Sequence, residues 1–99
     1  MIKVAAAWLR DEGSEAAADA VLASQLAIEY LDSWSDGHDD YFYDVALTLT
    51  VPPRLMPVLE RDRGPLRAVL ARLVSFFPDE TGDYRKGVLE RLEVVSATS

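Results

Sequence analysis

The sequence predicts an α+β domain, a small antiparallel sheet of three strands with helices packed on one face, in the order α-α-β-β-α-β. Three observations predict this fold. Apolar residues recur at helical spacings in residues 2–24 and 54–77, they alternate between residues 25 and 51, and a short valine-rich run follows at 88–95. The 99 residues, 49% hydrophobic and 27% charged, suit one domain with one core, residues 1–99.

Two helices are expected in the N-terminal third, at about residues 2–11 and 14–24. Gly13 separates them, and Ser14 has the side chain of an N-cap. The second helix is expected to end near Ser24, because this hydroxyl interrupts its apolar stripe. The residues expected on the inner faces are Val4, Ala5, Trp8, Ala17, Ala20 and Val21.

A β-hairpin is expected next, because the apolar period changes to two in QLAIEYLDSW (residues 25–34) and in YFYDVALTLTV (residues 41–51). The bend between them, SDGHDD, contains Gly37 and three aspartates, which favour turns. A continued helix over residues 26–33 is the alternative. The residues expected to share the inner face are Leu26, Ile28, Tyr30, Val45, Leu47, Leu49 and Val51.

The second half of the chain is expected to hold a helical region and a third strand. Pro52 and Pro53 end the hairpin, and a helical pattern begins at Arg54. Gly64-Pro65 bends or interrupts it, and a stripe follows that consists of Leu66, Val69, Leu70, Leu73, Val74 and Phe77. Residues 88–95, VLERLEVV, are expected to return beside the first strand, with a helix as the alternative. The tail, residues 96–99, is expected to fray.

Composition argues against several classes of function. No apolar run is long enough to span a bilayer, and the start of the chain is unlike a secretory signal, so a cytoplasmic protein without a membrane partner is expected. The chain has no cysteine, which removes disulfides and thiolate chemistry. Its net charge of −7 argues against nucleic acid as a partner. Residues 1–50 contribute −8 and residues 51–99 contribute +1, an asymmetry that favours a basic partner or head-to-tail association.

The bend around the chain's single histidine is the first candidate for chemistry. An EF-hand frame that begins at Asp32 fails, because its positions 3 and 12 hold Trp34 and Tyr43, and neither is a carboxylate. A looser metal site from Asp36, His38, Asp39 and Asp40 is the alternative to a plain turn. Ser33 or Ser35 beside His38 does not make a triad, since triad members converge from separate elements. We therefore expect no enzyme, no cofactor and no metal.

Aromatic and arginine side chains point instead to a protein partner. Large aromatic residues near the hairpin bend either enter the core or anchor an interface. Arginines in residues 54–72 alternate in part with acidic residues, which is typical of a solvated helix face, yet some of them are free to contact an acidic partner, including a second copy. The residues predicted to bind a partner are Trp34, Asp36, His38, Asp40, Phe42, Arg61, Arg67 and Arg72.

Several of these residues also carry a resemblance. Trp34, Asp36-Gly37, Asp40-Tyr41, the strand VALTLTVPPRL and the apolar helix after it resemble small accessory domains of bacterial conflict and phage-defence systems. Those domains pair a hairpin, bent at a W-x-G-G-like turn, with a proline-led helix. The resemblance covers roughly residues 26–95, and here the turn reads WSDG. It implies a binding or adaptor role and transfers no catalytic residue.

The function expected from the sequence is therefore a non-enzymatic protein–protein interaction or adaptor domain in a bacterial defence or signalling system. Self-association is one form of that interaction, since an uncovered sheet edge can add a strand. The alternative is an acidic immunity or inhibitor protein that blocks a basic toxin or nuclease site. A metal-dependent regulator or enzyme that uses the Asp/His bend is the third hypothesis.

Overall fold

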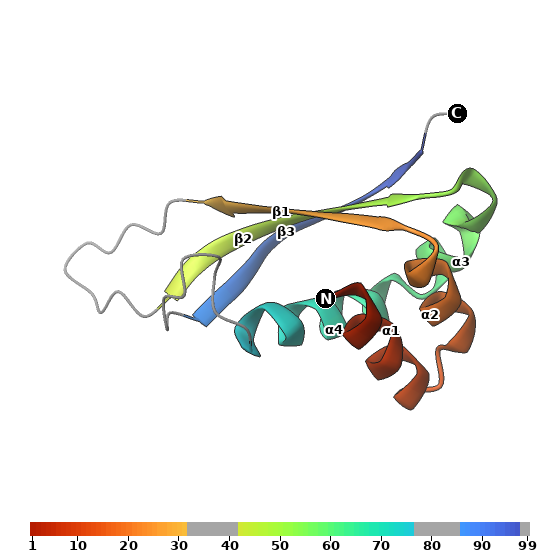
Figure 1. The fold of residues 1–99 in the computed structure, drawn as a ribbon, viewed down its shortest axis with the longest axis horizontal. Coiled ribbons are helices and arrows are strands. Elements are labelled where there is room, and N and C mark those ends of the chain that lie inside the picture. The colour runs from red at the N-terminus through yellow and green to blue at the C-terminus, as the bar shows by residue number, and fades with distance from the viewer. Residues whose placement is uncertain (32–41, 77–85, 98–99) are drawn as a thin grey trace.

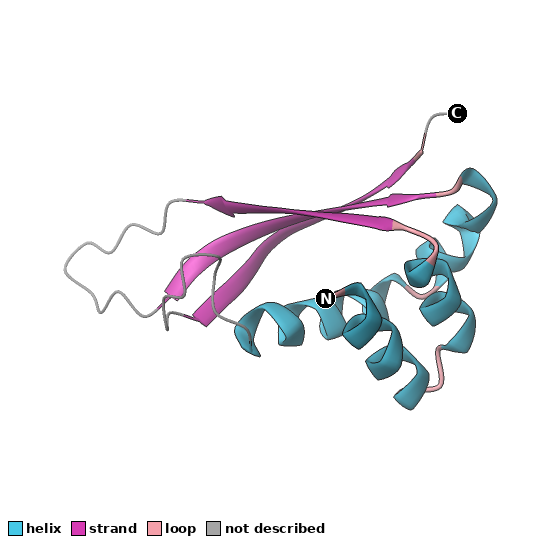
Figure 2. Ribbon diagram, in the orientation of Figure 1, coloured by secondary structure: helices cyan, strands magenta, loops and turns pink. Residues whose placement is uncertain are grey.

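The computed structural model describes residues 1–31, 42–76 and 86–97. Within them the chain is α+β, with four α-helices and a mixed sheet of three strands (Figures 1 and 2). Helices α1, α2 and α4 lie on one side of the sheet, as expected, and α3 lies at the end where β2 leaves the sheet (Figures 1 and 2). No helix in these residues combines the length and the apolar character needed to cross a membrane.

The expected hairpin is present. Strands β1 (Gln25–Leu31) and β2 (Phe42–Val51) pair antiparallel, with Ile28 opposite Leu47. The alternation in the sequence is reproduced, since β2 buries Val45, Leu47, Leu49 and Val51 toward the helices. The helical alternative for residues 26–31 is therefore wrong, and residues 32–41, which hold the bend, lie outside the described residues.

The third strand is present but runs in another direction than expected. β3 (Lys86–Ser96) pairs with β2, and the pair is parallel, so the order is β1-β2-β3. The expectation of a purely antiparallel sheet with β3 beside the first strand was wrong. The helices after β2 carry the chain back toward the beginning of that strand, so β3 starts at the same end as β2 (Figure 1).

β3 contains a bulge. Val45 is opposite Leu89, whereas its neighbour Ala46 is opposite Arg91, so Glu90 is an extra residue in β3. This extra residue places both Leu89 and Leu92 on the core side, although they are three residues apart in the sequence. β3 also extends beyond Val95, because the amide of Ala97 donates a hydrogen bond to the Val51 carbonyl oxygen at 2.8 Å.

The N-terminal helices match their predicted positions closely. They are α1 (Ile2–Asp11) and α2 (Glu15–Leu22), with Ser14 at the N-cap position of α2 but without a capping hydrogen bond from its side chain. Gly13 connects them with φ of +84°, a conformation that glycine adopts without strain. Ser24 follows α2 and is buried, and its hydroxyl donates to the Ala20 carbonyl oxygen at 2.6 Å. The buried hydroxyl is thus satisfied locally.

The remaining helices form the crossover between β2 and β3. A 3₁₀ turn (Pro53–Leu55) leads into α3 (Met56–Arg61), and α4 (Arg63–Phe76) follows after a break at Asp62. Gly64 and Pro65 lie in the first turn of α4, where proline costs no intrahelical hydrogen bond. The predicted stripe of α4 is confirmed for Leu66, Val69, Leu70, Leu73 and Val74, all buried, while Phe77 lies outside the described residues.

The core lies between the sheet and this helical layer. α4 packs on β3, and α1 packs on both α2 and α4. The largest fully buried side chains are Leu9, Leu47, Leu49, Leu59, Leu66, Leu70 and Leu73. Each such burial stabilises the fold by about 1.5–3 kcal/mol before the entropy cost of ordering is subtracted.

Candidate protein-interaction site

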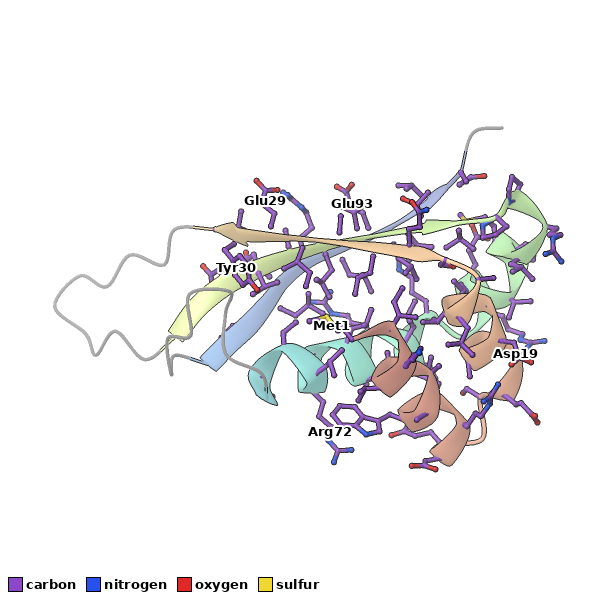
Figure 3. The ribbon with its side chains drawn as sticks, viewed as in Figure 1. Met1, Asp19, Glu29, Tyr30, Arg72 and Glu93 are labelled. Atoms are coloured by element: carbon purple, nitrogen blue, oxygen red, sulfur yellow. The ribbon has the colours of Figure 1, made fainter. Side chains whose placement is uncertain are left out.

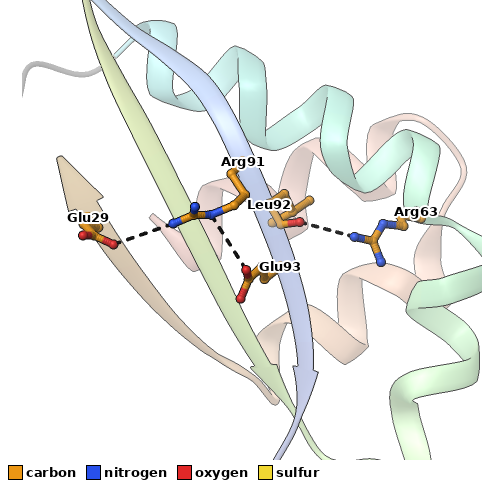
Figure 4. A network of polar contacts seen from close by, with 5 residues as sticks. All are labelled: Glu29, Arg63, Arg91, Leu92 and Glu93. Carbon is orange, nitrogen blue, oxygen red and sulfur yellow. Dashed lines mark hydrogen bonds and ion pairs between the residues drawn. The ribbon is translucent and has the colours of Figure 1, made fainter. Parts of the chain in front are cut away.

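The two edges of the sheet differ in whether side chains bond their backbone groups. At the outer edge of β3, arginine side chains bond two of the carbonyl groups. Nη2 of Arg63 donates to the carbonyl oxygen of Leu92 at 3.3 Å, and Nη2 of Arg67 donates to that of Leu89 at 3.4 Å (Figure 4 shows the first). Both arginines come from α4, four residues apart, so they lie on the same side of the helix. Two carbonyl groups of this edge are therefore already bonded.

A groove lies along α4 beside these arginines. Its lining consists of Arg63, Gly64, Arg67, Ala68 and Ala71, and its volume is about 570 Å³. The other lining side chains are small, and the wall is mainly apolar. The groove is open to solvent, so an extended chain has access to both arginines.

The outer edge of β1 has no such cover among the described residues. β1 has one neighbour in the sheet, β2, and its burial alternates between exposed and half-buried positions up to Ile28. Leu26 and Ile28 on its inner face are only half-buried, and Tyr30 is exposed, whereas the equivalent positions of β2 are fully buried. Within the described part of the chain, β1 thus presents a seven-residue strand edge with a partly buried apolar face, and Tyr30 lies on the side of the sheet that faces the helices (Figure 3).

The face of the sheet away from the helices carries a charged network. Arg91 of β3 reaches Glu29 of β1, with 4.0 Å between the charged atoms, and contacts Glu93 at 3.8 Å (Figure 4). Ala46 of β2 lies between Glu29 and Arg91 in the register and is only 4% exposed. We conclude that the Arg91 side chain crosses over Ala46 and closes this part of the face.

The structure does not bring the three predicted arginines together. Arg61 ends α3, with Nε 3.5 Å from the carboxylate of Asp62. Arg67 points to the β3 edge. Arg72 points to α1, where its guanidinium carbon lies 4.4 Å from the centroid of the Trp8 ring (Figure 3). Only Arg67 belongs to the groove.

The side chains of the other predicted partner-binding residues lie outside the described part of the structure. Trp34, Asp36, His38 and Asp40 lie outside the described residues, and of Phe42 only its position at the start of β2 is described. The candidate metal site in the bend is likewise outside. In the described ranges, no three histidine or acidic side chains are grouped closely enough to hold a metal ion.

Sequence reasoning missed Arg63, because its alternation with Asp62 suggested a solvated face. The available signal was the spacing of Arg63 and Arg67, four residues apart, with Ala71 continuing their stripe and with Gly64 and Ala68 on the neighbouring stripe of the same helix. That pattern describes a helix side with two cations and no bulky side chain between them. Comparison with protein-family models, curated proteins and solved structures found no match.

Proposed function

We propose that this chain is a non-enzymatic protein–protein interaction domain that pairs with a second copy of itself through β1. The observation that carries the proposal is the difference between the two sheet edges. Arginine side chains bond carbonyl groups of β3, whereas among the described residues no side chain bonds the outer edge of β1, and the apolar side chains of Leu26 and Ile28 are only half-buried. Natural proteins cover or charge the edges that must not pair, so an edge without such protection favours strand addition.

The sequence of β1 is suited to antiparallel pairing with itself. A two-fold axis at Ile28 places Leu26 opposite the partner's Tyr30 and keeps both on the inner face. The same register places Glu29 opposite the partner's Ala27, so no like charges face each other. An axis at Glu29 instead brings two carboxylates together, which is destabilising. Ile28 is therefore the favoured centre.

The oligomeric state and one exposed position test this proposal. Size-exclusion chromatography with light scattering over a range of concentrations should show a monomer–dimer equilibrium. Ala27→Glu places a carboxylate opposite Glu29 twice in the dimer and should weaken it by about 1–2 kcal/mol, since each like-charge pair costs up to about 1 kcal/mol. Ala27→Gln adds a side chain of nearly the same size as glutamate but without charge, so it should leave the dimer intact. Ala27→Lys places an opposite charge against Glu29 and should strengthen the dimer.

These variants also separate the dimer from its register. Ala27 is exposed, so each variant should keep the thermal stability of the monomer. A monomer at every concentration would remove self-association. A dimer that responds equally to glutamate, glutamine and lysine at residue 27 would remove the register centred on Ile28.

The alternative of an acidic inhibitor is supported by a different surface. Asp11, Glu12 and Glu15 are all exposed where α1 meets α2. Salt separates the two functions, because screening weakens attraction to a basic partner but relieves repulsion between two copies of charge −7. We expect the dimer to strengthen between 20 and about 200 mM salt. The setting in bacterial defence or signalling is a proposal that follows from the resemblance alone.

A further inference from the structure

We propose that the groove along α4, beside the outer edge of β3, binds an extended acidic segment of a different protein, with carboxylates on residues i and i+2 paired to Arg63 and Arg67. This site lies on the opposite edge of the sheet from β1 and does not depend on self-association. Four features of the described residues support it. They are the unfilled hydrogen-bonding capacity of the two arginines, the spacing of these arginines along α4, the small residues that line the groove beside them, and the positive charge of the two guanidinium groups.

The two arginines have capacity left for an anion. Their contacts to the carbonyl oxygens of Leu92 and Leu89, 3.3 and 3.4 Å long, are at the long end for N–H···O bonds. Each uses one of five guanidinium donors, and neither arginine forms an ion pair with a carboxylate within the described residues. A carboxylate forms shorter, charge-assisted and often bidentate bonds, so it outcompetes these contacts.

The spacing of the arginines selects an extended ligand. Residues four apart on a helix are separated by about 6 Å along the axis. Residues two apart on a β-strand are separated by about 6.7 Å and point to the same side. The carboxylates of a Glu-x-Glu or Asp-x-Asp segment therefore match Arg63 and Arg67, whereas adjacent carboxylates point in opposite directions.

The floor of the groove permits a close approach. Gly64, Ala68 and Ala71 carry at most a methyl group, so the backbone of an extended segment can lie beside the helix. The two guanidinium groups also give this side of α4 a positive charge, and no carboxylate of the described residues pairs with either of them. Complementary charge therefore steers an acidic segment to this side of an otherwise acidic protein.

A second copy of this chain is a poor source of the ligand. Its sequence contains one pair of acidic residues spaced by two, Glu60 and Asp62, and these lie at the end of α3 rather than in an extended segment. The groove consequently requires another protein. This separates it from the β1 contact, where the proposed occupant is the chain itself.

Fluorescence anisotropy with labelled synthetic peptides tests the proposal. The probe is a blocked heptapeptide with the centre Val-Glu-Val-Glu-Val, and the controls replace both Glu by Gln or place the two Glu side by side. The spaced peptide should bind at least tenfold more tightly than either control. Equal binding of all three peptides, or displacement by a single-stranded oligonucleotide of equal charge, would overturn the proposal.

Variants of the protein test the site itself. Arg63→Gln and Arg67→Gln should each weaken the spaced peptide about fivefold or more, while Arg61→Gln removes the same charge outside the groove and should change binding less than twofold. Ala68→Phe, at an exposed position, should abolish binding by filling the groove with both arginines intact. Arg63→Lys keeps the charge and the fold but loses the bidentate geometry, so it should also weaken binding.

The outcomes distinguish this site from the β1 contact. Ala27→Glu should leave peptide affinity unchanged, and Ala68→Phe should leave the monomer–dimer equilibrium unchanged. If Arg61→Gln weakens binding as much as Arg63→Gln, the attraction is general electrostatics and the proposed site is wrong. If peptide binding fails while the dimer persists, only this inference falls.

Discussion

Gly87 in β3 lies directly against the backbone of Val74 in α4. A Cβ atom at residue 87 would come within 2.6 Å of the Val74 carbonyl oxygen and within 3.3 Å of Cγ2 of Val45. The first distance is too short for real contacts, and a helix backbone cannot move aside as a flexible side chain can. The absence of a side chain at this position therefore sets how closely α4 packs on the beginning of β3.

The first prediction follows from this contact. Gly87→Ala should lower the free energy of unfolding by about 1–3 kcal/mol, because α4 must shift away from β3 or β3 must bend. Urea denaturation followed by circular dichroism measures it. The matched control is Gly64→Ala in the first turn of α4, where the added methyl group meets nothing within 4 Å beyond its chain neighbours and the backbone of its own helix. Gly64→Ala should be neutral or should stabilise the fold by up to about 1 kcal/mol. Equal losses of stability for Gly64→Ala and Gly87→Ala would contradict the close packing of residues 87 and 74.

The second prediction concerns the contact between α1 and α4. Arg72 is exposed and stacks over the Trp8 ring, so Arg72→Ala should cost about 0.5–1 kcal/mol of stability. Arg61→Ala also removes an exposed arginine, one that stacks on no ring of the described residues, and should cost less than about 0.5 kcal/mol. A double-mutant cycle with Trp8→Leu measures the coupling. A coupling energy near zero would show that Trp8 and Arg72 act independently.

The third prediction concerns Arg91 on the face away from the helices. Its ion pairs with Glu29 and Glu93 are exposed, so charge should contribute little and Glu29→Gln should change stability by less than about 0.5 kcal/mol. The aliphatic part of Arg91 should contribute more, because it covers Ala46. We expect Arg91→Met to keep most of the stability and Arg91→Ala to lose about 1 kcal/mol, measured by urea denaturation. If Arg91→Met loses as much stability as Arg91→Ala, the stabilisation comes from the charge of Arg91 and not from its aliphatic part.

Much of the fold could be predicted because the elements of this chain have clear periods. The period of two in β2 and the stripe of α4 both identify residues that the structure buries. Helix α1 has the predicted bounds, and α2 ends at Leu22, two residues before the buried Ser24 near which its end was predicted. In each case one local pattern and the tertiary environment demand the same structure.

Two properties of β3 were harder to predict from the sequence: that residues 88–95 form a strand and not a helix, and that this strand pairs parallel to its neighbour. Its bulge at Glu90 sets Leu89 and Leu92 three residues apart on one face, a spacing that also suits a helix. The parallel pairing depends on where the crossover helices return the chain, which no local pattern in residues 88–95 encodes. The groove depended in the same way on a contact across the fold, since the carbonyl groups that Arg63 and Arg67 bond belong to β3.

The fourth prediction tests the aspartate-rich bend, which lies outside the described residues. If Asp36, His38, Asp39 and Asp40 form only a turn, then calcium, magnesium, manganese and zinc should leave the melting temperature unchanged. A metal site in the folded state must raise it, by linkage, and the rise must grow with ion concentration. Thermal unfolding with each ion, in the chain and in a His38→Ala variant, measures this. A rise that disappears in the variant would establish a metal site and would favour the metal-dependent hypothesis over the plain turn.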